Sequence, residues 1–447
     1  MSKPLETLEE QLDSFDAAAR AEALEELIAM ADAGIVEVPP PGLAFNLHCH
    51  SFYSFNGYGY SPSRLAWLGR KKGLLAMGIV DFDVLDGVDE FLAACKRLRL
   101  RVCAGMETRV FIPEFGTRVI NSPGEPGISY HMGVGFTRTA VAQTDLLREL
   151  KQVAQDRTRG LVARVNTVLH EIELDFETHV LPLTPNGNVT ERHVCAAYEQ
   201  RARDHFDSEE ETISYWASVL HVHTEDIGAI YDSRPALQAL IRSKTMKAGG
   251  VGYVSPDGDE FPRIDRVNAF VKDAGAIPTH TWLDGASPGE EAIEELLDCT
   301  MAAGVAAVNI IPDRNWNIAN PDQKRIKVAK LNEFVALAEA RHLPVIVGTE
   351  LNAHGLPFVD DFDAPEMKPL HPVFLKGAYI LHAHTILQAQ AGMGYLSPWA
   401  EQHFGSIPEK NAFFEQVGAH TNSANPPAAW QPTPSDLPES VLSSLDA

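Results

Sequence analysis

Residues 43–50, LAFNLHCH, combine a short apolar run with two histidines, and five later runs follow the same plan. Each is rich in Val, Ile, Ala or Met and carries His, Asp or Glu near its end. These later runs are residues 74–83, 101–108, 128–136, 276–281 and 344–352. Apolar runs of this length, separated mostly by helical patterns, predict an α/β fold built on buried strands of a parallel sheet.

The polar residues of these runs are expected to meet in space. In a parallel barrel the carboxyl ends of all strands lie on one rim, where loops and side chains form the active site. The chain order therefore predicts a metal-dependent enzyme whose ligands converge from His48, His50, Asp81, Glu107, His131, His280 and Glu350.

Composition excludes several classes of protein. The net charge is −24 with only 37 Lys and Arg, which argues against a duplex nucleic-acid binder because that class needs a basic surface. A small anionic substrate remains compatible, since a bound metal ion dominates the local field. The five cysteines are scattered without C-x-x-C spacing, which is typical of a reducing compartment. The acidic N-terminus is unlike a signal peptide and no apolar run could span a bilayer, so we expect a cytoplasmic enzyme without membrane contact.

The chain divides into five expected segments. Residues 1–42 read as an N-terminal helical segment, and the barrel occupies residues 43–156 and 251–362. The stretch between these two parts is too long for one crossover connection, so residues 157–250 are predicted to form a mostly helical insertion. Insertions of this kind often act as lids or substrate walls. Residues 363–447 form a C-terminal extension.

The spacing His48-x-His50 suits metal chelation. On a strand, residues two apart point to the same face, so both imidazoles can bind one divalent ion. A carboxylate can bridge two cations, and Glu107 is placed for that role. Nitrogen and oxygen ligands without thiolate suit Zn²⁺, Mn²⁺ or Fe²⁺. Two such ions would polarise a phosphoryl group and generate a nucleophile from water near neutral pH.

These motifs resemble, in order and spacing, those of the PHP (polymerase and histidinol phosphatase) family. The segments that carry the resemblance are NLHCHSF, GIVDFDVLDG, AGMETRV, YHMGVGF, PTHTW and GTELNAHG, from residues 43–140 and 250–356. The resemblance implies a distorted (β/α)7 TIM-like barrel with metals at its carboxyl-end rim. It also implies a phosphoesterase, since the family includes histidinol phosphatase and nucleotide phosphoesterases.

The resemblance further implies a division of ligands between ions. One ion would be held by His48, His50, Glu107 and Glu350, and a second by Glu107, His131 and His280. The third site of the family pattern would consist of Asn56, Phe82 and Asn352, which are poor ligands or none. The three losses fall in one site, so we expect two divalent ions.

Other candidate site residues are chosen by the chemistry of their side chains and by their position in the sequence. Asp81 and Glu107 are the candidate catalytic carboxylates, although Asp81 could equally orient an imidazole or be an ordinary strand-end carboxylate. Candidates for binding the anionic substrate are Arg109, Arg192 and His193, followed by Lys244, Lys247 and Arg314. Two further His-x-His pairs, at 221 and 223 and at 382 and 384, are expected to be structural.

Three functions stay open at this level. A two-metal phosphoesterase acting on a small phosphorylated metabolite or nucleotide fits the ligands and the resemblance. A metal-dependent hydrolase of an amide or lactone is the alternative, because a metal-activated water attacks several electrophiles. A non-catalytic, metal-stabilised protein is the third, suggested by Phe82 and Asn352.

Overall fold

The seven strands of the protein lie side by side in chain order in a computed structural model, which describes residues 3–254, 260–421 and 430–445. They are β1 (Phe45–Asn46), β2 (Ala76–Phe82), β3 (Arg101–Phe111), β4 (Ile128–Val134), β5 (Ile277–Trp282), β6 (Ala307–Ile310) and β7 (Val345–Val347). Each arises from one of the apolar runs of the sequence, and β6 comes from the additional run at 304–311. The predicted α/β barrel fold is confirmed.

The first and last strands close the sheet on itself. Leu47 N donates to Val347 O at 3.0 Å, Glu350 N donates to His48 O at 2.8 Å, and His50 N donates to Glu350 O at 2.7 Å. These bonds extend the short strands β1 and β7 past their ends. The result is a seven-stranded barrel in which the His-x-His segment lies beside Glu350.

One strand departs from the expected parallel arrangement. β4 pairs antiparallel with both β3 and β5, whereas the other neighbouring strands are parallel. The reason is the connection between β3 and β4, which contains only a short 3₁₀ turn, η1 (Pro113–Phe115), and no crossover helix. Parallel neighbours are usually joined by a crossover helix, which this connection lacks. The carboxyl end of β4 therefore lies on the opposite rim from those of its neighbours.

Helices cover the barrel and its base. They are α3 (Pro62–Lys71), α4 (Val88–Leu98), α10 (Ile264–Asp273), α11 (Pro288–Glu291), α12 (Ile293–Ala302), α13 (Asp313–Trp316), α14 (Pro321–Ala340), α15 (His371–Ala391), α16 (Pro398–His403), α17 (Ile407–His420) and α18 (Pro438–Ser443). Two helices precede the barrel, α1 (Leu5–Gln11) and α2 (Ala17–Asp32), as the sequence predicts. No helix within the described ranges is long and apolar enough to cross a membrane.

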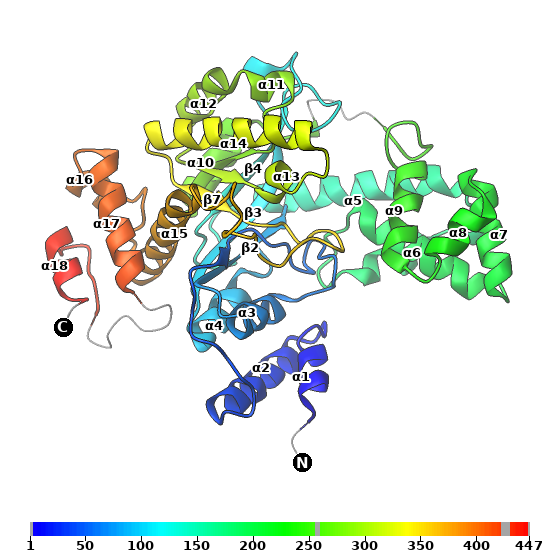
Figure 1. The fold of residues 1–447 in the computed structure, drawn as a ribbon, viewed down its shortest axis with the longest axis horizontal. Helices are drawn as coiled ribbons and strands as arrows, with labels where there is room; N and C mark the ends of the chain where they lie inside the picture. Colours follow the sequence, from blue (N-terminus) through cyan, green and yellow to red (C-terminus); the bar gives the residue numbers. More distant parts are fainter. Residues whose placement is uncertain (1–2, 255–259, 422–429, 446–447) are drawn as a thin grey trace. The chain divides into compact units, whose positions relative to one another are not determined.

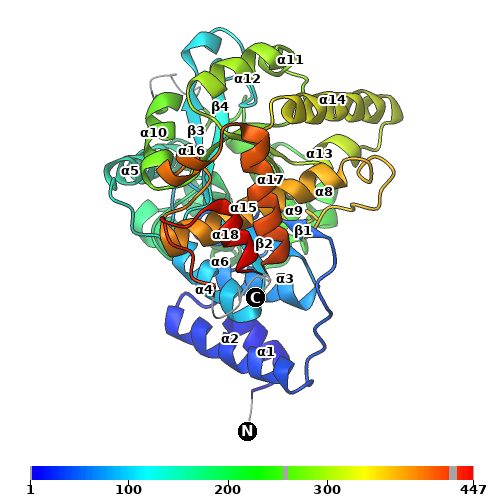
Figure 2. The same ribbon diagram turned by 90° about the vertical axis from the view of Figure 1, so that its left-hand side faces the viewer.

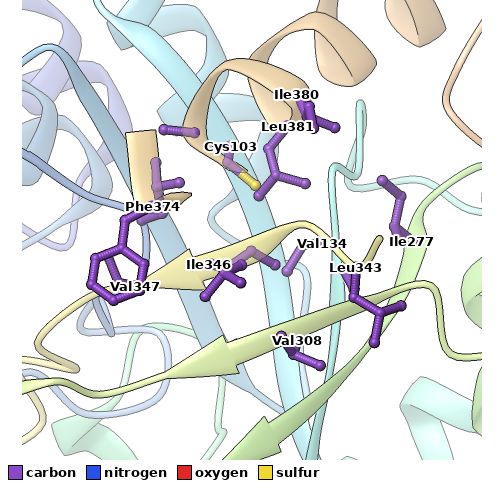
Figure 3. Packing of buried hydrophobic residues seen from close by; sticks show 14 of the residues in the cluster. Cys103, Val134, Ile277, Val308, Leu343, Ile346, Val347, Phe374, Ile380 and Leu381 are labelled. Carbon is purple, nitrogen blue, oxygen red and sulfur yellow. The ribbon is translucent and has the colours of Figure 1, made fainter. Parts of the chain in front are cut away.

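Helix α15 packs against the barrel at the amino ends of the parallel strands. Its Phe374, Ile380 and Leu381 belong to the main hydrophobic core with Cys103 and Ile346 of the strands, as Figure 3 shows. Its two histidines are anchors, as predicted from the sequence. His382 Nδ1 accepts from Val102 N at 3.2 Å, and His384 Nε2 lies 3.1 Å from Gly135 O. Helix α17 lies alongside α15 in both views (Figures 1 and 2).

A second compact unit consists of Phe52–Phe55 and Asp145–Pro256. It contains α5 (Asp145–Asn166), α6 (Glu191–His205), α7 (Glu209–Leu220), α8 (Thr224–Ile230) and α9 (Arg234–Thr245), with short turns η2 (His170–Ile172), η3 (Phe176–Val180) and η4 (Leu181–Leu183). These helices are drawn in cyan and green in Figure 1. They enclose their own core around Tyr198 and Trp216. The predicted helical insertion, residues 157–250, falls within the longer segment of this unit, Asp145–Pro256.

Gly348 lies where β7 approaches β1 closely, so we expect a larger residue at this position to destabilise the protein. A Cβ added there would overlap Asn46 Oδ1 and His48 N and would lie 2.7 Å from His48 Cβ. We expect Gly348→Ala to reduce the free energy of unfolding by roughly 1–3 kcal/mol, since overpacking at a close approach forces the backbone apart. Denaturant unfolding measures the change.

The matched control is Gly405→Ala. A Cβ at Gly405 would meet only Glu409 Oε2, at an ordinary 3.6 Å. Equal stability of the two variants would contradict the close approach of β7 to β1.

Candidate metal centre

Three predicted ligands, His48, His50 and Glu107, form a buried cluster inside the barrel. Glu107 Oε2 lies 3.4 Å from His50 Nε2 and 3.8 Å from His48 Nε2. One ligand atom from each residue lies within 4.8 Å of the others, and all three side chains are buried. Two ligands about 2.0–2.2 Å from a tetrahedral Zn²⁺ stand roughly 3.4 Å apart, so the spacing suits a single ion.

The donor atoms in this cluster are available for an ion. Within the described part of the chain, His48 Nε2 and Glu107 Oε2 have no hydrogen-bond partner although both are buried. A buried polar atom without a partner is costly, and native structures rarely leave one without a functional reason. Burial is also the main influence on the Glu107 carboxyl and raises its pKa. A bound cation would remove both penalties, so these residues fit a divalent metal.

Asn309 of β6 orients the first imidazole and was not among the residues singled out in the sequence. Its Oδ1 lies 3.3 Å from His48 Nδ1. An amide oxygen can only accept, so Nδ1 carries the proton and Nε2 keeps its lone pair toward Glu107. Asn309 is opposite Thr281 in the sheet, so both side chains face the barrel interior. The only signal in the sequence is one polar residue within the apolar run 304–311.

The three residues at the family's third-site positions have structural roles. The Phe82 ring stacks on His50 with centroids 4.4 Å apart. Asn56 Nδ2 donates to His50 O at 2.8 Å, and its Oδ1 accepts from Tyr58 N at 2.8 Å. Asn352 Nδ2 donates to Glu350 Oε2 at 3.2 Å. These contacts hold the neighbouring predicted ligands in place.

Asp81 supports the loop that follows the histidine pair. Its Oδ1 accepts from Ser51 N at 2.7 Å and its Oδ2 accepts from Ser51 Oγ at 2.6 Å. One oxygen therefore holds the backbone and the other the hydroxyl of Ser51, the residue directly after His50. This arrangement suits a positioning role, and direct participation of Asp81 in catalysis stays a prediction.

Glu350 lies beside the cluster and is paired with an arginine. Arg314 Nη2 donates to Glu350 Oε2 at 2.7 Å. Glu350 and Leu351 have φ values of 63° and 53°, in the left-handed region that non-glycine residues rarely adopt. Burial opposes ionisation of Glu350, but Arg314, His48 and His50 outweigh it and hold its pKa below the ordinary value. Glu350 is therefore an ionised carboxylate whose charge is shared between the arginine and the predicted metal site.

The structure does not bring His131 and His280 to Glu107. Opposite residues in a sheet share a face, and Glu107 is opposite Met132, whereas His131 is opposite Thr108 and His280. His131 Nε2 lies 2.6 Å from Asn268 Oδ1 of α10, outside the barrel. Burial lowers the pKa of His131 to about 4 and that of His280 to about 3, so both are neutral at pH 7.

This placement corrects the expected second site. The sequence identifies both histidines as strand residues, but alternation along β4 and β5 turns their rings to the outer face of the sheet, where His131 contacts Asn268 of α10. An ion shared by Glu107, His131 and His280 has no geometric basis in this arrangement.

The predicted substrate-binding residues have other contacts. Arg109 Nη1 donates to Glu125 Oε2 at 2.8 Å, and its guanidinium lies 4.4 Å from the centre of the Phe261 ring. Arg192 and His193 belong to the second unit. His193 Nδ1 accepts from Thr190 N at 3.1 Å and completes the N-terminal cap of α6, and its ring packs on Phe55. Their role toward a substrate stays a prediction.

The remaining His-x-His pair, His221 and His223, is exposed where α7 ends and α8 begins. Residue 221 is the left-handed C-terminal cap of α7, and residue 223 is the N-terminal cap of α8. This placement is structural, as the sequence predicts.

Residues 46–182 match the family model of the PHP domain. This part of the chain is therefore similar to a PHP domain. Among solved structures, an amidohydrolase from Chromobacterium violaceum with bound sulfate and no metal is 16% identical, with a TM-score of 0.49, over 75% of this chain and 96% of that one. A "putative metal-dependent phosphoesterase" from Bifidobacterium adolescentis is 18% identical, with a TM-score of 0.46, over 71% and 90%. A search of curated proteins found no match.

The PHP domain match covers the His-x-His segment, β2, β3 and β4. Together with the buried cluster of His48, His50 and Glu107, it supports a metal-dependent hydrolase.

The opposite orientations of the barrel histidines give a paired prediction. We expect His50→Gln to lower the content of bound Mn²⁺ or Zn²⁺ substantially, because it removes one of the clustered donors. His280→Gln is the matched control, since both histidines are buried barrel residues. It should retain the metal content of the wild type. Elemental analysis of purified, reconstituted protein measures both, and thermal melting verifies that each variant is folded. Loss of metal in His280→Gln would restore that residue as a ligand.

Asn309 gives a second prediction. Asn309→Leu removes the acceptor that fixes the His48 tautomer and should weaken metal affinity by about 10–100-fold, the usual effect of losing such a partner. Asn309→Asp keeps an acceptor at the same place and should bind metal more tightly than Asn309→Leu. Titration with Mn²⁺ or Zn²⁺ by calorimetry measures the affinities. Identical affinities for the two variants would show that Asn309 does not orient His48.

Proposed function

We propose that the protein is a metal-dependent phosphoesterase that acts on a small phosphorylated metabolite or nucleotide. The observation that supports this most directly is a buried ligand cluster, His48, His50 and Glu107, with the guanidinium of Arg314 paired to the adjacent Glu350. A Lewis-acid site next to a guanidinium suits a phosphoryl group, which presents several anionic oxygens.

The reaction would be hydrolysis of a phosphoester bond. A water oxygen bonds to phosphorus, the bond from phosphorus to the substrate oxygen breaks, and the products are an alcohol and a phosphate. A bound divalent ion would polarise a phosphoryl oxygen and make water nucleophilic near neutral pH. Nitrogen and oxygen donors at this centre favour Zn²⁺, Mn²⁺ or Fe²⁺.

The chain's own residues would prepare this chemistry. Asn309 holds His48 in one tautomer, and the Phe82 ring on His50 fixes the second imidazole and covers it with apolar surface. Asp81 holds the loop after the histidines through Ser51. A site whose ligands are fixed in advance loses less free energy to reorganisation when substrate arrives.

The substrate is proposed to be small because of charge. The net charge of −24 disfavours a long polyanion such as duplex nucleic acid, whose binding relies on a basic surface. A single phosphate group can be accommodated by the local field of one ion and one arginine.

The test is phosphate release from a panel of phosphomonoesters and phosphodiesters with added Mn²⁺ or Zn²⁺. We expect chelation to abolish activity, and Glu107→Gln to reduce it by at least about a hundredfold, because Lewis-acid stabilisation contributes several kcal/mol. The control is Glu295→Gln, which removes an exposed carboxylate paired with Arg118. Metal-loaded protein that cleaves amides or lactones but no phosphoester would contradict the proposal.

A further inference from the structure

We propose that Arg314 takes the place of a second metal ion in this centre. The site would then bind one divalent ion through His48, His50 and Glu107, and the guanidinium would be the second cation that binds the substrate's phosphate. This inference rests on the proposed function and specifies how its site recognises an anion.

The first step is that the described residues offer ligands for one ion. Among them, His48, His50 and Glu107 are the group that meets the spacing of a metal site. His131 points toward α10 with Asn268, and Phe82 stacks on His50. The arrangement therefore lacks imidazoles for a second ion at Glu107.

The second step concerns the next carboxylate in the cluster. Glu350 Oε2 already accepts from Arg314 Nη2 at 2.7 Å and from Asn352 Nδ2 at 3.2 Å. Its backbone is held on both sides, because Glu350 N donates to His48 O and Glu350 O accepts from His50 N. Glu350 stands at a position where the family pattern has a metal ligand. Here its carboxylate is instead paired with the guanidinium of Arg314.

The third step is access for a substrate. The Glu350 side chain is only 8% exposed, whereas that of Arg314 is 46% exposed. Arg314 lies on the short helix α13, which the buried neighbour Asn315 anchors by donating to Leu283 O at 2.9 Å. A guanidinium has five N–H donors in a planar fork, so it can bind Glu350 and an incoming phosphate together.

The fourth step is charge. The carboxylates of Glu107 and Glu350 cancel the two charges of one divalent ion, which leaves no net attraction for a phosphate. Arg314 adds one positive charge to the same centre. The carboxylate of Asp83, which accepts from Thr108 Oγ1 at 2.6 Å, adds a negative charge nearby. Without Arg314 the centre would therefore be net negative and repel an anion, whereas the guanidinium removes that repulsion and supplies the hydrogen-bond donors for a phosphate.

The experiment compares Arg314→Gln with Arg341→Gln in the full-length, metal-loaded protein. Arg341 is the matched control because it also pairs with a carboxylate, Asp298, at 2.8 Å. Two quantities are measured: metal per chain by elemental analysis, and binding of inorganic phosphate by calorimetry. Arg314→Lys is a second variant that keeps the charge, and thermal melting verifies folding.

We expect one ion per chain in the wild type and in Arg341→Gln. Arg314→Gln should bind phosphate at least about tenfold more weakly and retain at least one ion, while Arg314→Lys should recover part of the phosphate affinity. Two ions per wild-type chain, loss of the ion in Arg314→Gln, or unchanged phosphate binding in Arg314→Gln would each overturn the inference. Failure of the wild type to hydrolyse any phosphoester would overturn the proposed function alone, since neither readout depends on turnover.

Discussion

The hydrogen bonds that join β1 to β7 are the constraint on which the rest of the centre depends. They close the barrel and bring the His-x-His segment, near the start of the chain, against Glu350, near the end of the last strand. Asn46 reinforces the seam, because its amide donates to Thr349 Oγ1 at 2.8 Å and to Phe358 O at 2.7 Å. Glycine at 348 permits this approach. Without closure, the first two ligands and the arginine-bound carboxylate would belong to opposite edges of an open sheet.

Side-chain alternation then decides which residues belong to the centre. In a sheet covered on both faces, an outward histidine is buried as fully as an inward one, so burial does not distinguish them. His131 and His280 point outward and lie opposite each other. Asn309 and Thr281 point inward on the same part of the barrel. The same rule that places His48 and His50 on one face removes the other two histidines from it.

Electrostatics explains why so much polarity can be tolerated in the interior. Two imidazoles and two carboxylates lie in a buried space, where unpaired polar groups cost free energy. Arg314 compensates Glu350, and a divalent ion would compensate Glu107. The left-handed backbone at Glu350 and Leu351, and at Asp83 after β2, costs on the order of 1–3 kcal/mol per residue. Such strain persists because the closed barrel holds it.

The sequence by itself determined the strands, their order and the three candidate ligands of the centre. Within one strand, an apolar run indicates burial and the alternation of side chains indicates which residues share a face. This is enough to place His48 and His50 on one face and to place Glu107 near the end of a buried strand. The tertiary structure alone decided that β4 runs antiparallel, that His131 and His280 lie on the outer face of the sheet, and that Asn309 and Arg314 reach the centre. Those outcomes depend on the register between strands and on the path of a connection, which arise from contacts between residues far apart in the chain. The sequence of one strand does not indicate which side chains of the neighbouring strand will point into the barrel.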